Sequence, residues 1–170
     1  KTIYAVCLAP APALLFMFAA QYTHRERWLT KGLMAFIWGV VILEIVLVAT
    51  NRITGVYWPS IGLTTPAPDA MLDVRHGPIN VAISLLSYAL VLISIGMFLA
   101  TAAQTRDVYR IQNLLAAFAV IIPITANVLY VYDIGPLKHF DFTPVAFAAA
   151  GVLLAFATFR YHLVDLAPMA

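Results

Sequence analysis

The sequence predicts an all-α integral membrane protein, a bundle of five transmembrane helices. Hydrophobic residues make up 63% of the 170 positions and charged residues only 11%, whereas about 25% of a typical soluble domain is charged. A chain of this composition cannot cover a soluble globule with polar groups. Five apolar stretches are each about 20 residues long, which as helix crosses a bilayer core of about 30 Å. They are residues 3–22, 32–51, 79–103, 111–132 and 143–162.

The connections between these spans differ in length. Two are short, "THRERWLTK" after the first span and "AQTRDVYRIQ" after the third. The loop between the second and third spans is long, and its prolines and glycines exclude a long regular helix. This loop is predicted to be either a structured cap over the outer face or an open linker, and both alternatives remain. No internal repeat or low-complexity tract stands out, so residues 1–170 are expected to form a single helical transmembrane domain.

The distribution of Lys and Arg predicts the orientation, because these residues are enriched in cytoplasmic loops. The side that carries loops 24–31 and 104–110 is the more basic. Its basic residues are Arg25, Arg27, Lys31, Arg106, Arg110 and Arg160, against Lys1, Arg52, Arg75 and Lys138 on the other side. This side, and with it the C-terminus, is therefore expected to be cytoplasmic, in a multi-pass protein of the inner (plasma) membrane.

Glu44 is an ionisable residue well inside the second span. A carboxylate at such a depth costs a few kcal/mol unless it is paired, hydrated or protonated. It is interpreted either as a ligand contact or proton-sensitive switch, or as a protonated side chain bonded to one neighbouring helix. Polar residues in the outer halves of other spans suggest a pocket that opens outward, although ordinary interhelical hydrogen bonding is the alternative. The candidate ligand-binding residues are Glu44, Ser84, Tyr88, Asn127 and Tyr130.

Two further features concern the packing of the helices. Pro123 removes one backbone hydrogen bond in the fourth span, which commonly kinks a helix, so it is a candidate hinge. In the fifth span, Ala148, Gly151 and Ala155 share one face and permit close approach of another helix. This face is a candidate packing interface, either within the molecule or with a dimer partner.

The composition also argues against several classes of function. The single cysteine excludes a disulfide framework, and a net charge of +2 spread over loops gives no reason to expect a nucleic-acid partner. No metal, haem or other cofactor is expected, because the histidines are placed at the rims of the membrane: His24, His76, His139 and His162. No nucleophilic triad, phosphate loop or zinc spacing is present, so no catalytic residue is assigned.

Four pieces of sequence occur in an order that points to one family. They are Tyr22 with "RERWLT", Pro123 with Asn127, "DFTP", and the closing Arg160-Tyr161-x-Leu163-x-Asp165-Leu166-x-Pro168. Together they resemble the N-terminal seven-helix sensor region of membrane histidine kinases, also found on related bacterial signalling proteins of two-component systems. Many members have a histidine soon after the Thr-Asn pair at the end of the second span present here. This chain has "TNRITGVYW" instead, so no role of that histidine is transferred.

The resemblance implies seven spans, so two more are expected to precede Lys1. It also implies that the last helix leaves the membrane through Arg160, Asp165 and Pro168 and transmits a signal to a cytoplasmic module. The chain has no phosphoacceptor-histidine region and no ATP-binding boxes, so it is not expected to be an enzyme by itself.

Two functions are therefore considered. The first is a transmembrane signal-input domain that responds to a small extracellular or lipid ligand, or to a change in the membrane. The second is a non-catalytic structural or accessory subunit of a larger membrane complex. In both cases the expected partners are the lipid bilayer and other transmembrane helices, which belong to the chain's own missing spans, a homodimer mate or a complex subunit.

Overall fold

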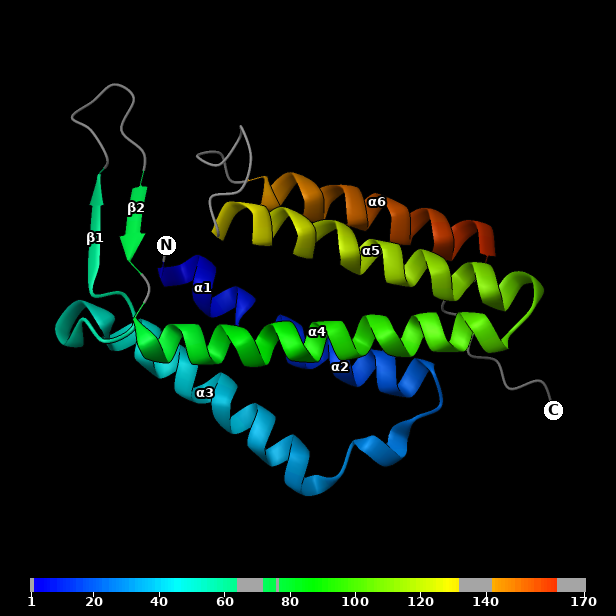
Figure 1. Ribbon diagram of the computed structural model, residues 1–170, viewed down its shortest axis with the longest axis horizontal. Helices are drawn as coiled ribbons and strands as arrows, with labels where there is room; N and C mark the ends of the chain where they lie inside the picture. Colours follow the sequence, from blue (N-terminus) through cyan, green and yellow to red (C-terminus); the bar gives the residue numbers. More distant parts are fainter. Residues whose placement is uncertain (1, 64–71, 76, 132–141, 162–170) are drawn as a thin grey trace. The chain divides into compact units, whose positions relative to one another are not determined.

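The computed structural model describes residues 2–63, 72–75, 77–131 and 142–161 (Figure 1). The chain divides into two compact units, Lys1–Ile93 and Ser94–Ala170, and each is described by itself. The elements in chain order are α1 (Thr2–Leu8), α2 (Ala11–Tyr22), the 3-10 helix η1 (Glu26–Trp28), α3 (Lys31–Thr54), β1 (Ser60–Leu63), β2 (Leu72–Arg75), α4 (Pro78–Gln104), α5 (Asp107–Val131) and α6 (Thr143–Tyr161).

The predicted membrane helices are present. Within the described residues, four helical stretches are long and apolar enough to cross a bilayer, and a fifth, Thr143–Phe156, is apolar but shorter. The four longer ones are Ala5–Tyr22, Lys31–Thr54, Pro78–Gln104 and Asp107–Leu129. The helical membrane fold is thus confirmed, with bounds close to those expected from hydropathy. The orientation of the C-terminus in the membrane stays a prediction.

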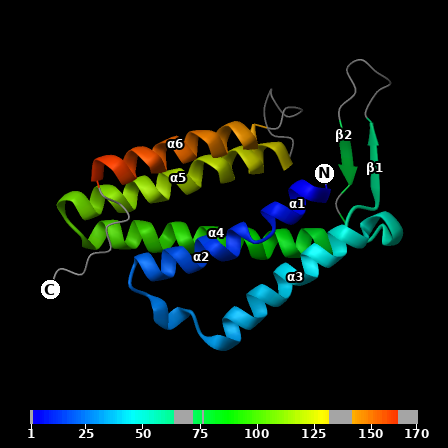
Figure 2. The same cartoon turned by 180° about the vertical axis from the view of Figure 1, so that it is seen from behind.

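The first span is not one continuous helix. It divides into α1 and α2 between Leu8 and Ala11, as the two blue segments in Figure 2 show. Proline has no N–H, and its ring clashes with the carbonyl group four residues earlier. Pro10 and Pro12 act on adjacent parts of the same turn, which explains a break there rather than a gentle bend. Hydropathy did not reveal this break because both prolines lie among apolar residues.

The ends of α3 follow from local chemistry. At its start, the hydroxyl oxygen of Thr30 accepts a hydrogen bond from the Leu33 N–H at 3.3 Å, and such a cap satisfies one of the free N–H groups of a first turn. At its end, Gly55 has a φ of +62° and donates its N–H to the Asn51 carbonyl at 2.8 Å. A left-handed residue in this position terminates helices and reverses the chain. The reversal directs the next residues back toward α3.

The long loop contains regular structure in the part that is described. β1 and β2 pair as an antiparallel hairpin, with Ser60 opposite Arg75 and Leu63 opposite Leu72. The helical pattern of the sequence did not predict these strands. The hairpin favours a structured loop over an open linker.

In the second unit, α5 and α6 lie side by side and antiparallel, as both views of the ribbon show (Figures 1 and 2). Many of the buried positions on the two helices are alanine: Ala116, Ala117, Ala119, Ala146 and Ala150. Small side chains allow the backbones of membrane helices to approach closely. α5 continues as a helix through Pro123, which is buried.

Candidate functional site

A buried asparagine organises the chain where it leaves α3. Oδ1 of Asn51 accepts hydrogen bonds from the backbone N–H groups of Tyr57 at 2.9 Å and Trp58 at 2.8 Å. Its Nδ2 donates to the Trp58 carbonyl oxygen at 3.3 Å. One amide side chain therefore satisfies three backbone groups that the turn after Gly55 would otherwise bury without partners. The segment Tyr57–Trp58 is consequently held against the last turns of α3.

Gly77 joins the same segment to the start of α4. Its N–H donates to the Tyr57 carbonyl oxygen at 3.1 Å. A Cβ added at this position would overlap the carbonyl oxygen of Val56 and lie 3.2 Å from that of Tyr57. Only glycine permits this close approach of two backbone segments. The segment after α3 is therefore linked to both α3 and α4.

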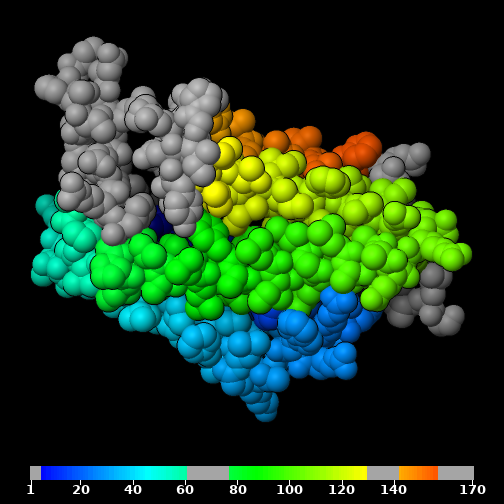
Figure 3. Space-filling model, in the orientation of Figure 1, coloured from blue at the N-terminus to red at the C-terminus, as the bar shows by residue number. Residues whose placement is uncertain are grey.

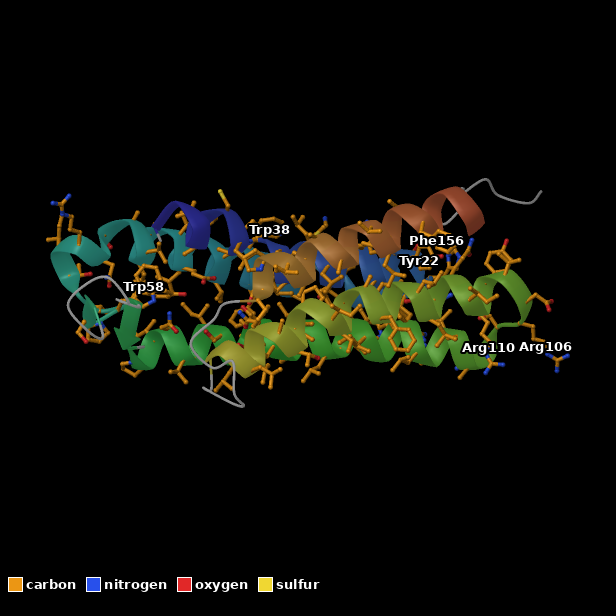
Figure 4. All side chains as sticks on the ribbon, turned by 90° about the horizontal axis from the view of Figure 1, so that it is seen from above. Tyr22, Trp38, Trp58, Arg106, Arg110 and Phe156 are labelled. Atoms are coloured by element: carbon orange, nitrogen blue, oxygen red, sulfur yellow. The ribbon has the colours of Figure 1, made fainter. Side chains whose placement is uncertain are left out.

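Two aromatic rings fill the space between these helices. The rings of Tyr57 and Trp58 pack edge to face, with centroids 5.1 Å apart and an interplanar angle of 75°. They form a buried cluster with Val48 of α3 and Ile83 of α4. Figure 3 shows the cyan end of α3 pressed against the green start of α4, and Figure 4 labels Trp58 at this end. We call this group of four residues the aromatic cluster.

Glu44 is bonded to this cluster. The hydroxyl group of Tyr57 donates to Oε1 of Glu44 at 2.7 Å. Burial raises the pKa of the Tyr57 phenol well above its usual range, and the hydrogen bond and charge of Glu44 raise it further. The phenol therefore keeps its proton and remains a hydrogen-bond donor. Glu44 lies about 15 Å along the helix axis from Thr54, at 1.5 Å per residue, so the bond connects the loop to a point deep inside the span.

A small hollow lies next to Glu44, entirely within the first unit. It is bounded by the break between α1 and α2, by α3 and by the first half of α4. It is only about the size of a water molecule. Its wall is mostly apolar, and its polar side chains are those of Glu44 and Ser87. The residues that line it from these elements include Ala9, Pro12, Val41, Glu44, Ser87 and Leu90.

Comparison with models of known protein families shows to which family this chain belongs. The family model described as the N-terminal 7TM region of histidine kinase matches residues 2–168. The chain belongs to this family. A search of curated proteins and a search of solved structures each found no match. The resemblance seen in the sequence is thus confirmed, and with it the assignment of a multi-pass membrane protein that belongs to the sensor part of histidine kinases.

Of the binding residues predicted for this 7TM region, Glu44 alone lines the hollow among the side chains that the structure describes. Glu44 is half-buried and lines the hollow, whereas the half-buried Ser84 and Tyr88 of α4 do not line it. Asn127 is half-buried in α5, in the second unit, so the hollow of the first unit is built without it. Tyr130 also belongs to α5, but its side chain lies outside the described residues. The ligand-binding role of all five residues stays a prediction.

Sequence reasoning missed two contributors to the site, Asn51 and Tyr57, whereas the spacing of Ser84, Ser87 and Tyr88 already places Ser87 on their shared face of α4. Ser87 lies one turn after Ile83 on the face of α4 that borders the hollow. Tyr57 lies in the long loop, outside the expected spans. A signal was present, because Asn51 lies four residues before Gly55 and shortly before the Tyr57-Trp58 pair. Asparagine is a residue whose side chain commonly bonds nearby backbone.

The remaining predicted positions of the 7TM region fall in or beyond α6. Ala148, Gly151 and Ala155 are all exposed, whereas Ala146 and Ala150 on the same helix are buried. The predicted packing face is therefore not covered by the described part of this chain. Arg160 belongs to α6, but its side chain, together with Asp165 and Pro168, lies outside the described residues. The expectation of no bound cofactor also stays a prediction.

The basic residues of the α4–α5 turn agree with its predicted place at a membrane surface. Arg106 and Arg110 are exposed, and Figure 4 shows both side chains projecting away from the helices at this end. Long basic side chains at the ends of membrane helices extend toward water and lipid phosphates.

Proposed function

We propose that this chain is the signal-input part of a histidine kinase in the inner membrane, and that it detects a ligand or a change in the membrane. The signal passes through α6, and the residues Arg160, Asp165 and Pro168, to a cytoplasmic output module. One observation carries the proposal beyond the family itself. The hydrogen bond from Tyr57 to Glu44 connects the loop after α3 to an acidic group inside the span.

This bond gives the domain two distinguishable states. A ligand shifts such an equilibrium only by its difference in affinity for the two states. In the described state Tyr57 is bonded to Glu44, and the loop is linked to the start of α4 through Gly77. Any ligand that competes for Glu44 weakens this state. Loss of the Tyr57–Glu44 bond then alters how the loop holds the first turns of α4.

α4 offers the path by which such a change leaves the first unit. It is one helix from Pro78 to Gln104, whereas the division between the two units falls after Ile93. A helix transmits displacement along its axis because its backbone hydrogen bonds make it stiff over several turns. A movement at the start of α4 therefore reaches the unit that contains α5 and α6. Pro123 in α5 is the proposed hinge in this unit.

A second function is supported by a different observation. The exposed face of Ala148, Gly151 and Ala155 offers a place for another transmembrane helix to approach closely. In this alternative the chain is an accessory subunit of a larger membrane complex and contacts another polypeptide through α6. It retains the sensor fold without an output module.

The mass of the native polypeptide distinguishes the two functions. This sequence accounts for 18.6 kDa. Denaturing mass spectrometry of the polypeptide that contains it should give a mass tens of kDa higher (a kinase module is a further domain or two of typical size). A mass close to 18.6 kDa would contradict the signal-input proposal and favour the accessory subunit.

The signal-input proposal also predicts the behaviour of variants. Glu44→Gln and Tyr57→Phe should change the basal autophosphorylation of the full-length protein in membranes, because both alter the described bond. Tyr109→Phe is the matched control, since Tyr109 is exposed on α5. Unchanged output in both test variants would contradict the role assigned to the bond.

A further inference from the structure

The chemistry of the hollow beside Glu44 indicates what kind of ligand it accepts. A carboxylate accepts hydrogen bonds at both oxygens and donates none when ionised, and a serine hydroxyl can accept as well. Tyr57 is the hydrogen-bond partner that the described residues provide for Glu44. The two polar side chains of the hollow are therefore complementary to a ligand that donates hydrogen bonds.

The hollow also borders the break between α1 and α2, through Ala9, Pro12 and Ala13. Because Pro10 and Pro12 have no N–H, the carbonyl groups four residues earlier, of Val6 and Leu8, lose their donors within the helix. On either side of the break, the Ala9 N–H donates to the Ala5 carbonyl at 2.9 Å, and the Leu14 N–H donates to the Pro10 carbonyl at 3.0 Å. Interrupted helices in membrane transporters bind cations through such unwound carbonyl groups.

We propose that the hollow is a binding site for the primary ammonium group of a small apolar amine, which replaces Tyr57 as the partner of Glu44. An ammonium group has three donors and no acceptor, which complements the carboxylate of Glu44 and the Ser87 hydroxyl, the two polar side chains that line the hollow. Its positive charge pairs with the carboxylate, and charged hydrogen bonds are about twice as strong as neutral ones. The residues that line the hollow are mostly apolar, and they would contact the hydrocarbon body of the ligand.

The size of the hollow couples binding to a change in the protein. The space is no larger than about one water molecule, so an ammonium group with an attached carbon chain enters only if a neighbouring side chain moves. The phenol of Tyr57 is the group that shares Glu44 with the ligand. Its departure disturbs the edge-to-face contact with Trp58. This inference names the ligand class for the site of the proposed function and rests on that proposal.

The fluorescence of Trp58 provides a direct test. The whole chain, in lipid nanodiscs, carries Trp28→Phe and Trp38→Phe so that Trp58 is the remaining tryptophan. It is titrated with hexylamine, hexanol and hexanoate, which share one hydrocarbon chain. Hexylamine should shift the Trp58 emission saturably, with an affinity at least about tenfold higher than that of the other two, as expected for a charged hydrogen bond.

Variants separate binding at Glu44 from partitioning into the lipid. Glu44→Gln should abolish the saturable shift, and Ser87→Ala should weaken hexylamine binding several-fold. Glu26→Gln, which removes an exposed acidic group in η1, is the matched control and should bind hexylamine as the parent chain does. Ser87→Ala retains the carboxylate, so it remains a test if Glu44→Gln does not fold.

Two results would overturn the inference. Equal responses to hexanol and hexylamine would show that charge has no part in recognition. A response to hexylamine that survives in both Glu44→Gln and Ser87→Ala would show that the amine acts through the membrane. If hexylamine does not bind while Glu44→Gln and Tyr57→Phe still change the kinase output, the ligand class is wrong and the proposed function stands. If those variants leave the output unchanged, the proposed function itself fails.

Discussion

Two regions of the molecule are held together in different ways. One is the end of the first unit where α3 meets α4, and the other is the α5–α6 pair of the second unit. In the first, a loop folds back between two helices, and a buried asparagine, two aromatic rings and a glycine hold it there. In the second, helices adjacent in sequence pack side by side through positions that are largely alanine. One contact depends on particular polar atoms, and the other on the volume of side chains.

The difference suggests why the first region is the better place for a sensor. A contact made of a few directional hydrogen bonds has a distinct broken state, because a competing donor or acceptor can replace one partner. A contact made of small apolar side chains has no such competitor, and it weakens only when the helices separate. The bond between Tyr57 and Glu44 is of the first kind.

The largest effect is expected at Gly77. Gly77→Ala places a Cβ against the Val56 carbonyl oxygen, and backbone cannot yield as a flexible side chain does, so we expect a loss of about 3 kcal/mol of stability. Gly96→Ala in the same helix is the control, since a Cβ there meets nothing within 4 Å and stability should be equal or slightly higher. Denaturant unfolding in detergent measures both. Similar losses in the two variants would refute the assigned close approach.

An intermediate effect is expected in the α5–α6 pair. Ala150→Leu adds volume at a buried position of α6, which should cost about 2 kcal/mol. Ala148→Leu on the exposed face of the same helix should change stability by less than about 0.5 kcal/mol. The same unfolding assay compares them. A larger loss for Ala148→Leu in the native assembly would mean that another helix covers this face, as the accessory-subunit alternative requires.

The smallest effect is expected for Tyr57→Phe, which removes one hydrogen bond and should cost about 1 kcal/mol near neutral pH. The effect depends on pH. Because the pKa of Tyr57 is raised in the folded state, its contribution is fully present below the ordinary tyrosine pKa of about 10. It is lost as the pH rises from there through the folded value, since the unfolded chain releases the proton first.

Unfolding measured at a series of alkaline pH values tests this linkage. Wild-type stability should fall more steeply than that of Tyr57→Phe above about pH 10, because only the wild type has this phenol. Glu44→Gln should lie between the two, since burial continues to raise the pKa of Tyr57 while the charge of Glu44 is removed. Parallel curves for all three proteins would show that Tyr57 is not buried as described.

Several local features could be predicted from sequence to within a few residues. The spans ending near Tyr22 and beginning at Thr143 agree with the helix bounds of the structure. The end of α3 lies three residues later than expected, at Thr54 rather than at Asn51. Hydropathy did not detect this, because the stop is made by the left-handed Gly55 and not by a loss of apolar residues. The hairpin was missed for a related reason, since β1 and β2 are short and follow no helical period.

The candidate site could be predicted only in part. Glu44 was identified because an acidic group inside an apolar span is costly wherever it points. The spacing of Ser84, Ser87 and Tyr88 predicts that they share a face of α4, but of these three only Ser87 lines the hollow. A rotation of a helix by one residue, about 100°, decides which side chains meet. Periodicity along one helix contains no information about its rotation relative to another.

The sequence by itself determined that this protein crosses a membrane, where its helices run and to which family it belongs. These are properties of single segments, because each span must be apolar and must satisfy its own backbone hydrogen bonds in lipid. Only the tertiary structure decided that Asn51 binds the backbone of Trp58, that Tyr57 reaches Glu44, and that Gly77 lies against the loop. Those contacts depend on how the chain returns after Gly55 and on how α3 and α4 face each other, which no single segment specifies.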